Sequence, residues 1–290
     1  MTTGSQTASA RTAALTALAM AAFAANSLLC RLALGHALID AASFATVRMA
    51  AGATILSLIV WLRGRNFRGH ADWRTAAALF VYMAFFSFAY RSLTAGTGAL
   101  ILFGAVQLTM FVMALRAGEH FSILSWMGLA AATAGLVYLM TPGLTAPDPI
   151  GGLLMAAAGT AWGFYSLLGR GAADPLQATA ANFVWGVPLT LAVSLLFAGS
   201  VHASPGGLAL ALASGAVASG CGYVIWYAAL PGLTGTQAAT VQLTVPIIAA
   251  FGGVMLLSEQ VTLRLLIASA ATLGGVAVVL AQRAAKKRRV

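Results

Sequence analysis

The chain has 290 residues, of which 60% are hydrophobic and only 8% are charged, and its 16 Lys and Arg against 6 Asp and Glu give a formal net charge of +10. A soluble domain carries about a quarter charged residues, so this composition excludes a soluble enzyme, a disordered tail and a fibrous repeat. Long charge-poor apolar stretches recur along the whole chain, which is typical of a polytopic α-helical membrane protein rather than a β-barrel.

Ten apolar stretches, each close to the ~20 residues that a bilayer core requires, predict ten transmembrane helices. They cover approximately residues 12–34, 41–62, 73–94, 97–115, 122–140, 150–169, 177–198, 206–230, 236–257 and 262–282. Prolines and glycines fall between them, as at Pro142, Pro147 and Pro149 and at Pro231-Gly232. The predicted fold class is therefore all-α, with ten transmembrane helices.

The basic residues favour one orientation in a bacterial inner membrane. With a cytoplasmic N-terminus, twelve of the sixteen Lys and Arg lie on the cytoplasmic side and three, Arg31, Arg91 and Arg264, on the outer side. The twelve are Arg11, Arg63, Arg65, Arg68, Arg74, Arg116, Arg170, Arg283, Lys286, Lys287, Arg288 and Arg289. Both termini are thus predicted to be cytoplasmic, with the basic tail on anionic lipid, and nucleic acid is not expected as a partner.

The second half of the chain repeats the first faintly. Ser27-Leu28-Leu29-Cys30-Arg31 ends the first stretch, and Ser166-Leu167-Leu168-Gly169-Arg170 ends the sixth. Glu119 and Glu259 follow the fourth and ninth stretches, 140 residues apart. Five stretches per half is an odd number, so the halves must enter the membrane from opposite faces, as in many transporters. We expect one five-helix repeat in residues 1–145 and its inverted copy, with the basic tail, in residues 146–290.

Several short motifs accompany the repeat. They are Trp162-Gly163 with Arg170 in the sixth stretch, Trp226-Tyr227-Ala228-Ala229-Leu230 closing the eighth, Pro246 and Leu257-Ser258-Glu259 in the ninth, and Gly274-Gly275 in the tenth. With them the chain resembles the ten-helix EamA-type members of the drug/metabolite transporter superfamily, and most of all the bacterial exporters of aromatic amino acids. The resemblance implies an inner-membrane exporter with a central cavity between two inverted halves. Val106 at the position equivalent to Pro246, and Phe23-Ala24 in place of a Trp-Gly, depart from the pattern in the first half.

Polar residues at membrane depth are the candidate site. All six acids and four histidines fall in loops or at the ends of stretches, so the cargo is predicted to be neutral or zwitterionic, and a carboxylate-based proton relay is not expected. The mid-depth amides are Asn26, Gln107, Asn182 and Gln242. Pro246 removes the N–H that would pair with the Gln242 carbonyl, which favours Gln242 as a substrate ligand. Interhelical hydrogen bonds are the alternative for each amide.

Aromatic residues are the second candidate set. Tyr82, Trp162, Tyr165 and Trp185 lie at depths where an aromatic belt does not explain them, and rings there would suit an apolar or aromatic cargo. Packing or lipid contact is the alternative. Arg48, the one charged residue well inside a stretch, either holds a backbone carbonyl or attracts a substrate carboxylate, and we favour the structural role.

The predicted function is secondary transport, the export of aromatic and other neutral amino acids by alternating access, as a uniport or exchanger, with proton coupling left open. Export of drugs or other small neutral metabolites by the same fold is the first alternative. An intramembrane enzyme is the remote one, because no acid or histidine accompanies the Ser and Thr of the stretches. The two cysteines, Cys30 and Cys221, indicate neither a disulfide framework nor a metal site, and no cofactor is expected. Monomer and homodimer both remain open.

Overall fold

The structure, a computed structural model, describes residues 3–65, 72–143, 145–169, 172–233 and 235–287, and of residues 3–9, 235–236, 283 and 286–287 it describes the backbone alone. Arg68, Arg170, Arg288 and Arg289 lie outside the described residues. The α-helices are α1 (Thr3–Gly35), α2 (Ala41–Leu62), α3 (Trp73–Ala89), α4 (Ala95–Arg116), α5 (Ile123–Met140), α6 (Pro149–Leu168), α7 (Pro175–Leu196), α8 (Pro205–Leu212), α9 (Gly222–Ala229), α10 (Gly235–Gln242), α11 (Thr244–Leu257) and α12 (Leu263–Lys287).

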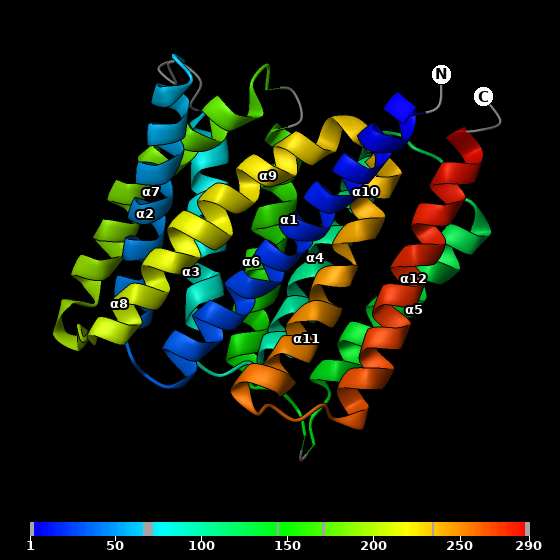
Figure 1. The fold of residues 1–290 in the computed structure, drawn as a ribbon. Helices are drawn as coiled ribbons and strands as arrows, with labels where there is room; N and C mark the ends of the chain where they lie inside the picture. Colours follow the sequence, from blue (N-terminus) through cyan, green and yellow to red (C-terminus); the bar gives the residue numbers. More distant parts are fainter. Residues whose placement is uncertain (1–2, 66–71, 144, 170–171, 234, 288–290) are drawn as a thin grey trace.

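The described residues contain ten membrane-crossing segments, as the sequence predicts. Nine are long and apolar enough to cross a bilayer, and the tenth is the shorter apolar helix α3. The predicted third segment extends to residue 94, but α3 ends at Ala89 because Tyr90–Thr94 turn to cap α4. Since ten is even, both termini lie at the same end of the bundle, which we call the terminal side (Figure 1).

Helices from the two halves of the chain pack against each other. α3 and α4 pack against α6, while α9 and α11 pack against α1. Two further pairs, α2 with α7 and α5 with α12, each join a helix of the first half of the chain to one of the second (Figure 1). The core therefore contains α1, α4 and α6, with the most deeply buried surface on α4.

Two membrane crossings are not continuous α-helices. The eighth crossing passes through the π-helix η3 (Ala213–Cys221) between α8 and α9, and the ninth is interrupted at Leu243 between α10 and α11. Pro246 explains the second break, because its missing N–H cannot bond the Gln242 carbonyl. At Gly215 in η3 an added Cβ would meet the carbonyl oxygen of Arg48, so glycine is what lets η3 approach α2 this closely.

Small residues, among them Gly128, Gly135 and Gly275, hold α5 and α12 together. A Cβ added to Gly128 would meet the carbonyl oxygen of Gly275, and the hydroxyl of Thr272 donates to the Ala132 carbonyl at 3.4 Å. Gly274 differs, because nothing lies within 4 Å of the position its Cβ would take. Close backbone approach of this kind drives helix association in lipid, where the hydrophobic effect does not act between helices.

We predict that Gly128→Ala lowers the melting temperature of the protein, because the added methyl group must push α12 away from α5 at a cost of about 1–3 kcal/mol. Gly274→Ala is the matched control and should leave the melting temperature unchanged or slightly raised, since alanine favours helix. Thermal unfolding of both variants in detergent measures the difference. Equal melting temperatures for the two variants would contradict the packing described here.

Candidate functional site

A cavity of about 1720 Å³ lies inside the bundle and opens on the terminal side. The residues around its mouth come from helix ends and connections on that side, among them Glu119, Ser122, Gly169, Pro175 and Gln282. None of its described lining residues belongs to the connections at the other end of the bundle, which we call the closed side. The cavity therefore reaches from the terminal side to the middle of the helices and ends there.

Stacked aromatic rings form one wall of the cavity. The ring of Trp162 on α6 stacks on Tyr165 at 5.1 Å and on Tyr223 of α9 at 5.5 Å between centroids. Tyr82 on α3 lies 4.8 Å from Trp162 with its ring tilted by 46°. Tyr82, Trp162 and Tyr165, all predicted for the site, are thus brought together from two helices, and the wall can stack against a flat apolar group.

All four predicted amide side chains line the cavity, but they differ in their hydrogen bonds. Asn26 accepts a hydrogen bond from the Ser214 hydroxyl at 2.6 Å, and Asn182 accepts one from the Thr75 hydroxyl at 3.0 Å. These two amides therefore also make the interhelical bonds that the sequence left as the alternative. Gln242, half-buried beside the break in the ninth crossing, lines the wall as well. Gln107 is buried, and its Nε2 has no hydrogen-bond partner.

Trp185 lies elsewhere. Its side chain is 59% exposed on the outside of α7, and it does not line the cavity. The depth of a residue along a helix is readable from sequence, but the direction in which it points is not, because α7 shows no clear division between an apolar and a polar face. We leave Trp185 out of the site.

Other lining residues were not among the predicted ones. Phe23, Tyr223 and Trp226 extend the aromatic wall, with the Phe23 ring 5.8 Å from Tyr223 and 6.1 Å from Trp226. Thr179 accepts a hydrogen bond from the Tyr165 hydroxyl at 3.2 Å and lies 2.6 Å from that of Tyr227. The four-residue spacing of Tyr223 and Tyr227 was a usable signal for this helix face.

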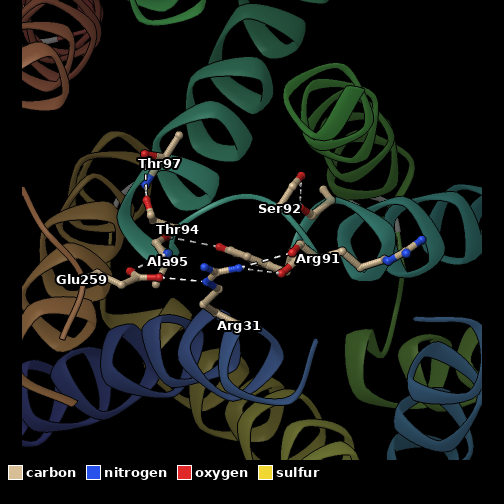
Figure 2. A network of polar contacts seen from close by, with 9 residues as sticks. Arg31, Arg91, Ser92, Thr94, Ala95, Thr97 and Glu259 are labelled. Atoms are coloured by element: carbon tan, nitrogen blue, oxygen red, sulfur yellow. Dashed lines mark hydrogen bonds and ion pairs between the residues drawn. The ribbon is translucent and has the colours of Figure 1, made fainter. Parts of the chain in front are cut away.

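The closed side is held by polar contacts between distant parts of the chain (Figure 2). Arg31 at the end of α1 donates through Nε to Glu259 at 2.9 Å, and its Nη1 donates to the carbonyls of Tyr90 and Arg91 at 3.4 Å. The other oxygen of Glu259 accepts the backbone N–H of Ala95 at 2.9 Å, at the start of α4. One ion pair thus ties α1, the α3–α4 connection and the α11–α12 connection together.

A second contact joins the α3–α4 connection to the start of α6 on the closed side. Asp148 accepts the backbone N–H of Gly151 at 2.7 Å and the hydroxyl of Ser92 at 2.9 Å. These two hydrogen bonds hold the pKa of Asp148 below its usual range, so the carboxylate stays charged at neutral pH. By contrast Glu119, which the sequence pairs with Glu259, lies at the open mouth of the cavity.

We predict that Glu259→Gln loosens the closed side, because the amide can still accept from Ala95 but no longer balances the charge of Arg31. The reporter is Phe23→Cys on the cavity wall, in a background that carries Cys30→Ser and Cys221→Ser. With Glu259→Gln this cysteine should react about fivefold faster with a membrane-impermeant maleimide added from the closed side than it does with Glu259 intact, as expected for a loss of ~1 kcal/mol. Arg91→Gln, which removes an exposed arginine on the same side, is the control. Equal labelling rates would show that the ion pair does not restrain opening.

Comparisons with known proteins agree with this architecture. Residues 149–281 match the EamA-like transporter family. The chain is 50% identical over 280 residues to an uncharacterized protein of Pseudomonas aeruginosa, an alignment that covers 96% of this chain and 98% of that protein. A solved crystal structure has the same fold, with a TM-score of 0.64 over 92% of this chain and 99% of that one, at 21% identity.

The ten apolar crossings of the described residues surround an internal cavity and, with the family match, define a multi-pass membrane protein that transports small molecules. Residues 149–281 form an EamA-like transporter family domain. The EamA-type resemblance expected from the sequence motifs is confirmed over these residues.

Proposed function

We propose that the protein is a secondary transporter that exports aromatic and other neutral amino acids across the bacterial inner membrane. The observation that carries the proposal is the cavity, which combines a wall of stacked rings with amides at the same depth. The rings suit the side chain of an aromatic amino acid. Amides and carbonyls at the helix break suit its ammonium and carboxylate.

Transport in this proposal proceeds by alternating access between two inverted halves, residues 1–145 and 146–290. The antiparallel course of α1 and α6 supports it, as does the placement of the matched Glu119 and Glu259 at opposite ends of the bundle. The conformation described here is open on the terminal side and closed by the Arg31–Glu259 pair on the other. With no acid or histidine among the described mid-span residues, we propose a uniport or exchange cycle.

We place the terminal side in the cytoplasm. Arg11, Arg63, Arg74 and Arg116 lie on this side, in keeping with the rule that cytoplasmic ends are basic. The exposed rings of Trp61 and Trp73 lie at the same level, where an aromatic belt is expected. The open cavity then faces the cytoplasm, from which it can bind a cargo for export. The transporter in this proposal is a monomer or a homodimer.

We predict that Trp162→Ala weakens the binding of L-phenylalanine at least tenfold, because it removes the central ring of the aromatic wall. Trp185→Ala is the matched control, since that ring lies outside the cavity, and it should change binding less than twofold. Uptake of labelled phenylalanine, threonine and methionine into proteoliposomes, with inhibition curves for each variant, gives the measurement. The absence of flux above empty vesicles for all three would overturn the amino-acid proposal.

The size of the cavity favours a second candidate, the export of drugs or other small neutral metabolites. Its volume of about 1720 Å³ exceeds the ~300–1,000 Å³ usual for a ligand pocket. A panel of compounds tested for thermal stabilisation of the purified protein distinguishes the two, because a ligand that binds the folded state raises the melting temperature, and at equal concentration a tighter ligand raises it more. Stabilisation by larger apolar compounds and none by amino acids would favour this second function.

A further inference from the structure

Arg48 is a charged side chain buried in the middle of the bundle without an acidic partner. It lies about two turns inside α2 from the closed side, and none of its side chain is exposed. Its guanidinium carbon lies 4.8 Å from the ring centroid of Phe86 and 5.4 Å from that of Tyr82. Rings hold the charge in place but do not neutralise it.

The unsatisfied atoms around the cavity are all donors. Among the described residues, the buried side-chain nitrogen and oxygen atoms without a hydrogen-bond partner are Nε and Nη1 of Arg48 and Nε2 of Gln107. A buried arginine with a purely structural role is expected to fill its donors with carbonyls or carboxylates, since unpaired charge at membrane depth is costly. These donors therefore lack hydrogen-bond acceptors, and the charge of Arg48 lacks a negative partner. An anionic ligand would supply both.

Two hydroxyl groups connect Arg48 to the cavity. Its Nη2 donates to the Tyr82 hydroxyl at 3.1 Å and to the Ser219 hydroxyl at 3.4 Å, and both Tyr82 and Ser219 line the cavity. A hydroxyl has one hydrogen, and an oxygen that accepts from Arg48 is free to direct that hydrogen to another acceptor. Arg48 thus orients two hydroxyls as donors beside the aromatic wall, at the deep end of the cavity.

We propose that this arrangement is a carboxylate-binding subsite, in which Tyr82 and Ser219 donate to the cargo and Arg48 supplies the positive charge behind them. The inference rests on the proposed transport function of the cavity and narrows its substrate class to carboxylic acid anions with an apolar or aromatic body. The ammonium of an amino acid is dispensable at this subsite. Organic cations of the same size are excluded by the charge of Arg48.

Three probes of matched size test the subsite on the wild-type protein: 3-phenylpropionate, its neutral amide 3-phenylpropionamide, and the cation 2-phenylethylamine. Binding is followed by quenching of tryptophan fluorescence in detergent. We expect the carboxylate to bind about tenfold more tightly than the amide, the difference typical of a charge-assisted hydrogen bond, and the cation to bind weakest. Equal affinities for carboxylate and amide would overturn the subsite.

Variants then locate the preference. Arg48→Gln should abolish the preference for the carboxylate over the amide, and Arg48→Lys, which keeps the charge, should retain part of that preference. Tyr82→Phe keeps Arg48 and removes one donor, so it decides the question if Arg48→Gln fails to fold. Arg91→Gln removes an exposed arginine remote from the cavity and should change nothing. A preference that survives both Arg48→Gln and Tyr82→Phe would overturn the assignment.

Flux of labelled L-phenylalanine in proteoliposomes separates this inference from the proposed function. Flux without a carboxylate preference in binding would overturn the subsite and leave the amino-acid transporter in place. A carboxylate preference that depends on Arg48, without any phenylalanine flux, would support the subsite and overturn amino-acid transport.

Discussion

The structure depends on one constraint, that a polar group at membrane depth must find a partner inside the protein. Helices satisfy the backbone, and most of the described buried polar side chains have partners, among them the hydroxyl–amide pairs Ser214 with Asn26 and Thr75 with Asn182. The described exceptions are Arg48 and Gln107, and both belong to the surroundings of the cavity. The donors without a protein partner thus lie beside the cavity, where a bound cargo can accept their hydrogen bonds.

The contacts at the closed side and those between α5 and α12 differ in how easily a transport cycle can break them. On the closed side Arg31, Glu259 and the start of α4 share one network (Figure 2). Ser92 also donates to Asp148 on this side. These contacts are few, polar and near water, so they can be exchanged at small cost. The α5–α12 contact is different, because backbones touch at Gly128 and Gly275 and close packing resists deformation. We therefore expect motion at the closed side and rigid packing between α5 and α12.

The irregular crossings explain how the cavity acquires its chemistry. The π-helix η3 carries Ser214 and Ser219, the residues that bond Asn26 and Arg48. The break at Leu243 places Gln242 on the wall beside backbone freed by Pro246. A regular helix would have used that backbone carbonyl in its own hydrogen bonds, so the break supplies a polar group to a lipid-embedded site.

The sequence by itself determined the number of crossings, their approximate ends and the depth of each polar residue, because hydropathy and length are local properties of a chain in a bilayer. Short motifs such as Trp162-Gly163 also predicted the EamA resemblance, which the family match confirms over residues 149–281. Only the tertiary structure decided which residues at one depth face the cavity, bringing Tyr82 and Trp162 together and leaving Trp185 outside. It likewise revealed that Arg48 lacks an acidic partner. These outcomes depend on the rotation of each helix against its neighbours, which is fixed by contacts between segments far apart in the chain.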